Sequence, residues 1–211
     1  MDGLRALGAV IRVPRILDHG ADFVLLESLE LRRDGDWAAL GRMLAGLHRQ
    51  RGPRYGWHRD NYIGLSPQAN GWAEDWNEFW WSRRLAPQLE RAGLRAEFLR
   101  HALEDHRPAP ALLHGDLWSG NAGFIDEGPV VFDPAVYYGD READLAMTEL
   151  FGGFAPEFYT AYQRELPLGD GYAWRKHLYN LYHLLNHLNL FGGAYRAQVE
   201  ATLGLLRRRF E

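Results

Sequence analysis

Three polar side chains stand at a spacing that suits phosphoryl transfer. Asp116 and Asn121 lie in the segment HGDLWSGN, which reads H-x-D-x-x-x-x-N, and Asp133 follows a pair of short apolar runs. One carboxylate can accept or orient a hydroxyl proton, while an amide oxygen and a second carboxylate hold Mg²⁺ on the phosphates. An alternative stays open on spacing alone, because Asp and Asn also form turns and cap strand ends. The hairpin expected between Asn121 and Asp133 favours the catalytic interpretation.

The composition limits the class of protein. The chain has 211 residues, of which 46% are hydrophobic and 25% charged, so it can form a globular core as one large domain or two small ones. The net charge of −4 predicts no general attraction to nucleic acid or anionic lipid. No membrane-spanning run or secretory pattern is visible, and the lack of cysteine excludes disulfides and thiolate zinc sites. We expect a cytoplasmic protein without a nucleic-acid or membrane partner.

Hydrophobic periodicity predicts a small, broken sheet followed by a mostly helical body. Strands are expected over residues 12–17 and 23–26, and a helix after Asp36, where apolar residues recur at three- and four-residue steps. The other expected elements are a long loop over 51–71, helices over 72–93 (kinked at Pro87) and 94–106, strands over 122–125 and 130–132, and helices over 140–151, 156–165, 172–191 and 195–209.

Longer motifs extend this picture over most of the chain. They are HGDLWSGNAGF, FDPAVYYGDREADLAM, ELFGGF, DNYIG, NGWAEDWNEFW and LYNLYHLLNHLNLFGGAY. Together they resemble the fructosamine-3-kinase (ketosamine-3-kinase) family, which is similar in fold to aminoglycoside phosphotransferases and protein kinases. The resemblance implies an α+β, mostly helical fold: the C-terminal lobe of a protein-kinase-like fold over residues 28–211, with the hinge. Residues 1–27, a helix end and two strands, would be only a remnant of the N-terminal lobe sheet.

The same resemblance implies an activity and its central residues. The reaction would be ATP-dependent phosphorylation of the 3-hydroxyl of a ketosamine, either a small molecule or a glycated protein, as in protein deglycation. Asp116 matches the catalytic aspartate of the family, and Asn121 and Asp133 match the ligands of Mg²⁺. ATP would be the co-substrate.

Three consecutive residues are candidates for nucleotide binding. The stretch FVLLESLEL over 23–31 looks like the family's hinge, in which backbone groups of Glu27, Ser28 and Leu29 would meet the adenine edge. A plain buried strand followed by a loop remains the alternative for these positions.

Two further residues have roles that the resemblance suggests. Trp118 would lie beside the sugar, where an aromatic face can pack on the apolar side of a ring, although an ordinary packing role is also open. Asp144 resembles a carboxylate that braces the catalytic loop by accepting backbone N–H bonds, with a plain surface acid as the alternative. Asp140, one helical turn earlier, is most simply a helix N-cap.

His183 and His187 stand four residues apart on a predicted helix and could in principle chelate a metal. The zincin pattern requires Glu directly after the first His, and Leu184 occupies that position. The surrounding Leu and Tyr residues instead favour a buried helix whose polar side chains are satisfied.

Two features of kinase-like folds are missing from this sequence. Those folds use a Gly-rich loop over the phosphates and a strand lysine paired with a helix glutamate. No such loop precedes the hinge, and Lys176, the only lysine, follows the catalytic segment. We therefore expect the front of the family's usual chain to be absent, through a late start site, a truncation or a genuine half-kinase.

On this interpretation the chain as given should be nearly inactive and prone to associate. The strands between Val13 and Leu26 would leave an unpaired sheet edge, so we expect a homodimer or aggregate through them. Two other functions stay open: a non-catalytic binding lobe, and an aminoglycoside-type phosphotransferase. The latter shares the catalytic segment but does not explain DNYIG.

Overall fold

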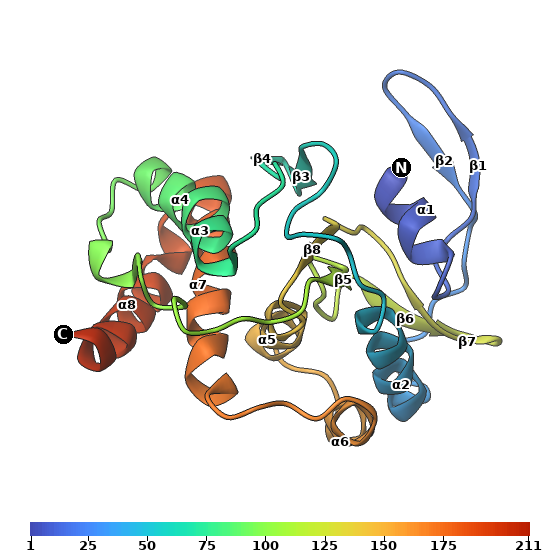
Figure 1. The fold of residues 1–211 in the computed structure, drawn as a ribbon. Helices are drawn as coiled ribbons and strands as arrows, with labels where there is room; N and C mark the ends of the chain where they lie inside the picture. The colour runs from blue at the N-terminus through green and yellow to red at the C-terminus, as the bar shows by residue number, and fades with distance from the viewer.

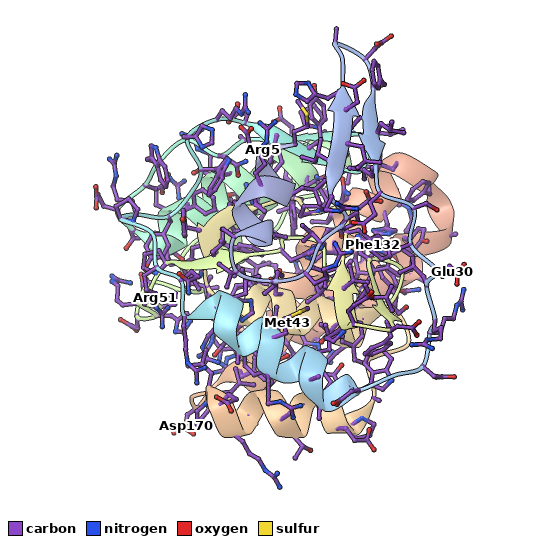
Figure 2. The ribbon with its side chains drawn as sticks, turned by 90° about the vertical axis from the view of Figure 1, so that its right-hand side faces the viewer. Arg5, Glu30, Met43, Arg51, Phe132 and Asp170 are labelled. Atoms are coloured by element: carbon purple, nitrogen blue, oxygen red, sulfur yellow. The ribbon has the colours of Figure 1, made fainter.

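Helices and four separate two-stranded antiparallel sheets make up the computed structural model, which describes residues 1–211 (Figure 1). The chain begins with α1 (Asp2–Gly8), followed by the hairpin of β1 (Ile16–His19) and β2 (Val24–Leu26). In two views at right angles this hairpin projects from the rest of the molecule (Figures 1 and 2). The α+β class expected from the sequence is therefore confirmed, and so is the strand predicted over 23–26, whereas the strand predicted over 12–17 begins only at Ile16 and continues to His19.

Helix α2 (Trp37–His48) begins where the sequence predicts. Asp36 caps it, because its Oδ1 accepts the Ala39 N–H at 2.7 Å. The helix packs closely on α6 (Pro156–Glu165): a Cβ at Gly41 would lie 2.3 Å from the carbonyl oxygen of Phe158. Glycine at this position therefore sets the distance between the two helices.

The predicted helix over 72–93 starts later and contains a wide turn. It consists of α3 (Trp76–Trp80), the π-helical turn η1 (Trp81–Leu85) and α4 (Ala86–Arg91). Pro87 has no N–H to donate to the carbonyl of Arg83, and the guanidinium of Arg84 donates to that oxygen at 3.2 Å instead. The irregularity lies one turn before the proline that causes it.

The predicted helix over 94–106 is wrong. Only the 3₁₀ turn η2 (Glu97–Leu99) forms there, followed by turns. The side chain of Asn77 on α3 donates to the carbonyl of Arg100 at 2.9 Å and accepts the Leu103 N–H at 3.0 Å. These bonds satisfy backbone groups that a helix would otherwise have paired.

The C-terminal half supplies most of the buried helical surface. Helix α7 (Tyr172–Phe191), confirmed with the predicted bounds, packs on α5 (Glu142–Leu150) and α8 (Arg196–Phe210) (Figure 1). Tyr179 on α7 is fully buried, and its ring lies 4.8 Å from that of Trp80 in a T-shaped contact. No helix of the structure is long and apolar enough to cross a membrane.

Two short sheets flank the segments that contain the polar motif. Strand β5 (Ala111–Leu113) pairs with β8 (Tyr137–Gly139), and β6 (Ala122–Ile125) pairs with β7 (Gly128–Val131) (Figure 1). The segment from β5 to β6 contains Asp116 and Asn121, and the segment from β7 to β8 contains Asp133. The two pairings therefore bring the motif residues toward one place.

The segment over 51–71 is not the continuous loop that the sequence predicts. It contains a hairpin of β3 (Asn61–Ile63) and β4 (Ser66–Gln68), closed by the two-residue turn Gly64–Leu65. Gly64 has φ = +56°, a conformation that is costly for residues with a Cβ. The hairpin lies within the motif DNYIG and its continuation.

One hydrophobic core includes both ends of the chain. It contains Leu4 and Leu7 of α1 as well as Val199 and Leu206 of α8. The division into units 1–27 and 28–211 stays a prediction.

Candidate active site

The three motif residues line one cavity of about 540 Å³, together with Trp118. The backbone N–H of Phe132 donates to the carbonyl of Asn121 at 3.0 Å, which fixes Asp133 beside the candidate catalytic loop, residues 114–121. The remaining lining residues come from the β3–β4 hairpin, from the segment after Asp133 and from the last two turns of α7. The cavity is therefore assembled from segments far apart in the sequence.

Asn121 holds the candidate catalytic carboxylate through one side of its amide. Its Nδ2 donates to the carbonyl oxygen of Asp116 at 2.8 Å and to Asp116 Oδ2 at 3.2 Å. Asn121 is 6% exposed, and its Oδ1 accepts no hydrogen bond from the protein. An amide oxygen that has no donor within the protein is available to a cation.

Burial raises the pKa of Asp116 to about 7, against the lowering effect of the Asn121 hydrogen bond; the charges of Asp144 and Asp133 raise it further. His183 lies close by, with Nδ1 at 3.9 Å from Asp116 Oδ1. Burial lowers the pKa of His183 to about 3, so the ring is neutral at pH 7. Asp116 therefore has no cation beside it in the structure.

The raised pKa of Asp116 predicts that Asp116→Asn stabilises the fold increasingly as the pH rises. Because the folded-state pKa lies above the unfolded value of 3.8, wild-type stability is complete below pH 3.8 and falls as the pH rises toward about 7. The variant has no carboxylate to ionise, so its advantage in the free energy of unfolding should grow by roughly 2 kcal/mol between pH 5 and pH 8. Urea unfolding in EDTA without nucleotide measures this. If the difference in the free energy of unfolding between variant and wild type does not change with pH, the buried environment of Asp116 is contradicted. Asp105→Asn, at an exposed position, is the control.

Asp133 has a strained backbone. Its φ of +51° makes it the only non-glycine residue in the chain with positive φ, and its side chain is exposed to the cavity. Residues held in this region cost of order 1–3 kcal/mol and cluster at functional sites. The conformation aims a carboxylate at the cavity that also receives the free oxygen of Asn121.

Asp144 lies beneath the catalytic loop and is fully buried. Its carboxylate accepts the backbone N–H groups of His114 at 2.7 Å and Gly115 at 2.8 Å, and it contacts His48 Nε2 at 3.1 Å. Burial alone would raise the pKa of Asp144, but these hydrogen bonds and the nearby imidazoles hold it below the usual value.

Gly115 is required where the loop crosses the segment after Asp133. It has φ = +84°, and a Cβ there would lie 2.0 Å from the carbonyl oxygen of Ala135. The backbone N–H of Ala135 in turn donates to His114 at 2.8 Å. Any other residue at this position would displace the catalytic loop.

The candidate hinge residues Glu27, Ser28 and Leu29 do not line this cavity. Glu27 binds Arg12 and Arg15, and the Arg12 hydrogen bond lowers its pKa to about 2. The backbone groups of Ser28 and Leu29 make no hydrogen bond within the protein, so they are available to a ligand. A few residues further on, Arg32 forms an antiparallel bridge with Phe124 of β6. Asn121 directly precedes this strand.

Trp118 is half-buried at the cavity, and its ring contacts Phe151 with centroids 6.0 Å apart. The two histidines of α7 differ from the prediction of satisfied, buried side chains. His183 is buried, but its Nδ1 has no partner, and His187 lines the cavity with Nδ1 bonded to the carbonyl of His183 at 2.8 Å. They do not form a metal-chelating pair.

Sequence reasoning missed a network of amides under the β3–β4 hairpin. Gln68 donates to Asn61 and to the carbonyl of Ala135, and Asn61 donates to the carbonyl of Val136, all within 3.0 Å. Tyr182 on α7 donates to Gln68 at 2.8 Å. The motif DNYIG was the only signal in the sequence, and it did not show which residues these side chains would reach.

A second buried network was also missed. Asp140 accepts the first-turn N–H of Glu142, as a cap would, but it also binds His106 at 2.7 Å and Tyr179 at 2.6 Å. Arg175 forms two hydrogen bonds to the Glu142 carboxylate, at 2.6 and 2.7 Å. His106, Asp140 and Glu142 are close enough to hold a metal, but these partners already engage their ligand atoms.

The fold belongs to a class that includes kinases of small molecules. A solved structure of a choline/ethanolamine kinase family protein from Mesorhizobium loti superposes with a TM-score of 0.58 at 14% identity, over 98% of this chain and 77% of that one. At this identity the likeness shows the fold alone.

Closer relatives identify the family. The family model described as fructosamine kinase matches residues 1–208, and the chain belongs to that family. A probable ketoamine kinase of Synechocystis is 47% identical, over 95% of this chain and 75% of the relative. The crystal structure of a putative fructosamine-3-kinase from Haemophilus somnus superposes with a TM-score of 0.91 at 30% identity, over 97% of this chain and 77% of that one. The family predicted from the sequence motifs is confirmed.

Proposed function

We propose that this chain transfers the γ-phosphoryl group of ATP to the 3-hydroxyl of a ketosamine, the sugar adduct of an amine, and so acts in deglycation. Membership of the fructosamine kinase family supports the reaction class. The observation that carries the proposal is the convergence of Asp116, Asn121 and Asp133 on one cavity, with the Asn121 oxygen unpaired and the Asp133 backbone strained.

Asp116 would orient the acceptor hydroxyl. Its Oδ2 already accepts a hydrogen bond from Asn121, so Oδ1 is the oxygen that can accept the hydroxyl proton. A loose transition state needs little base strength early in the reaction, so a carboxylate that takes the proton late is adequate. The pKa of about 7 for Asp116 suits a group that must first accept and then release a proton.

Asn121 and Asp133 would hold Mg²⁺. Both offer oxygen ligands, which suit this ion, and the unpaired Oδ1 of Asn121 fits such a role. Bound there, Mg²⁺ supplies positive charge to the phosphates of ATP. Asn121 also positions Asp116, so one amide would connect the ion with the acceptor-binding carboxylate.

Asp133→Ala should weaken the binding of Mg-ATP at least tenfold, because it removes a ligand of the ion. Calorimetric titration with ATP in the presence of Mg²⁺ measures the effect, and ADP gives the same comparison with a shorter phosphate chain. Asp126→Ala is a matched control, since Asp126 lies in the turn of the neighbouring β6–β7 hairpin with a side chain that is 90% exposed. Unchanged affinity in Asp133→Ala would remove Asp133 from the metal site.

Two further roles complete the proposal. Backbone groups of Glu27, Ser28 and Leu29 would meet the adenine, which is supported by the free backbone groups of Ser28 and Leu29. Trp118 would pack on the sugar ring, which is supported by its position on the cavity beside Asp116.

A reduced rate is part of the proposal. The only lysine, Lys176, pairs with Glu149 at 2.5 Å and does not line the cavity, so no lysine meets the phosphates within these 211 residues. We expect turnover below the ~1–100 per second that is typical of kinases. A non-catalytic binding lobe and an aminoglycoside-type phosphotransferase remain the alternatives. Assays with ketosamine and with aminoglycoside acceptors, alongside titration with each, separate the three.

The N-terminal hairpin predicts self-association. Leu17, Phe23 and Leu25 are all more than half exposed, and β1 and β2 pair only with each other. Unpaired edges with apolar side chains tend to add further strands, so we expect a homodimer through this hairpin. Sedimentation of the wild-type chain and of Phe23→Lys should show a concentration-dependent dimer that the variant loses. A wild-type protein that stays monomeric at 100 μM (roughly the upper range of such assays) would contradict it.

A further inference from the structure

Three large apolar side chains surround the mouth of the catalytic cavity. Tyr62 is 65% exposed, Leu65 is 85% exposed and Phe191 is 64% exposed. They are the three most exposed large hydrophobic side chains of the whole chain, and all three line the cavity that contains Asp116. We call these three residues the apolar rim. Exposed apolar groups gathered at one site indicate a binding surface, whereas scattered ones do not.

The part of the rim on the hairpin is held in a fixed position. Asn61 and Gln68 lie opposite each other at the open end of the β3–β4 hairpin, and they donate hydrogen bonds to the carbonyls of Val136 and Ala135 respectively. The tip is a two-residue turn with Gly64 at a positive φ. Leu65 is therefore presented to solvent by a buried network, and its exposure does not come from a loose loop.

The rest of the rim comes from the end of α7, which abuts the hairpin. A Cβ on Gly64 would lie 3.8 Å from Cδ1 of Leu190, so the turn and the helix are in contact range. Phe191 is the last residue of α7, and its ring lies 5.5 Å from that of His187, which lines the same cavity. The two sides form one continuous apolar mouth above a polar floor.

The charges of the cavity lie on its floor and are all negative. Asp116 and Asp133 are its only carboxylates, and no lysine or arginine lines it. An acceptor with a carboxylate at the mouth would find no cation to pair with it. The cavity therefore favours an acceptor whose outer part is apolar and uncharged, or cationic next to the sugar.

We propose that the apolar rim binds the carrier of the ketosamine, the part contributed by the amine, and that the preferred carriers are apolar next to the amine. This rests on the function proposed above. In a ketosamine the nitrogen is three bonds from C3, so a sugar whose 3-hydroxyl meets Asp116 directs its carrier out of the cavity. The carrier therefore extends through the mouth of the cavity, past Leu65 and Phe191.

The test uses the fructosamines that form from glucose and methylamine, butylamine or hexylamine. Each is added to the 211-residue chain. Their dissociation constants are measured by calorimetry without ATP, so that the readout does not depend on turnover. We expect hexylamine ketosamine to bind at least about tenfold more tightly than the methylamine compound, as partial burial of the added methylenes implies. Hexylamine alone should bind far more weakly than its ketosamine.

Leu65→Ser and Phe191→Ser should each reduce this ratio to below about threefold. Leu205→Ser is the matched control, because Leu205 is an exposed leucine of α8 that does not line the cavity, and it should keep the wild-type ratio. Circular dichroism checks that the variants are folded. Sedimentation of the same variants tests a second copy of this chain as the occupant.

Each result decides the matter. The role of the rim is overturned if the two dissociation constants are nearly equal in wild type. It is also overturned if their ratio stays at the wild-type value in both Leu65→Ser and Phe191→Ser. In either case the proposed function stands if the methylamine compound is phosphorylated. Failure of every ketosamine to bind overturns both proposals. Loss of a dimer in the rim variants, with an unchanged binding ratio, would show that the rim is a self-association surface instead.

Discussion

Asp116→Asn should lower the rate of phosphate transfer to a ketosamine by at least about 10²-fold, while the affinity for Mg-ATP stays within about twofold. A positioned base contributes roughly 10²–10⁴ to such a rate. The asparagine keeps the shape of the side chain, so the contact with Asn121 persists, but it cannot accept the hydroxyl proton on a carboxylate oxygen. In the proposed site the nucleotide is held by other groups, which is why binding and turnover should separate.

The rate is followed as ADP formation with ketosamine and, in parallel, as formation of the phosphorylated ketosamine by mass spectrometry. Calorimetry gives the affinity for Mg-ATP. Asp105→Asn, which changes an exposed aspartate, should behave as wild type in both assays. Turnover of Asp116→Asn within a few-fold of wild type would exclude the assigned role.

The second large effect is expected for Asp144→Ala, which should lower the free energy of unfolding by about 3–5 kcal/mol. The carboxylate is fully buried and binds the N–H groups of His114 and Gly115, so its removal leaves two backbone donors without partners. The contact with His48 is lost as well. Because these donors lie in the candidate catalytic loop, the same change should also reduce turnover.

The loss should depend on pH in a defined direction. The folded-state pKa of Asp144 lies below its usual value, so the stability it contributes is present above the unfolded pKa and is lost as the pH falls through the folded one. Urea unfolding of wild type and variant should therefore differ most near neutral pH and converge in acid. An equal difference at pH 7 and pH 3, or a loss below about 1 kcal/mol, would show that Asp144 is not the brace that the geometry indicates.

Helices with strong periodicity could be predicted from the sequence, because local pattern and tertiary burial agree there. The bounds of α7 match the prediction, since its apolar stripe continues to the Gly192 that ends it. The expected helix over 94–106 failed for a reason that no local pattern contains. Asn77, which is distant in the sequence, binds backbone groups of Arg100 and Leu103 and replaces the helical bonds.

The residues of the candidate site were predicted from their spacing together with the family motifs, but the geometry of the site could not be predicted. The sequence could not show that Asn121 would leave one oxygen unpaired, or that Asp133 would have a positive φ. The anchoring of the β3–β4 hairpin was equally hidden, because Gln68 reaches Ala135 and Tyr182 only in the folded chain. These features depend on contacts between distant segments, which one sequence does not specify.

The most direct test of the central claim is transfer of phosphate from ATP to a ketosamine under single-turnover conditions, with the 211-residue chain in excess so that slow transfer is detected. A ¹H–³¹P correlation spectrum of the product identifies the phosphorylated oxygen. We predict a phosphate coupled to the proton on C3, formed by wild type and by Asp105→Asn but not by Asp116→Asn. Phosphate on another hydroxyl, no transfer by wild type, or equal transfer by Asp116→Asn would contradict the assignment.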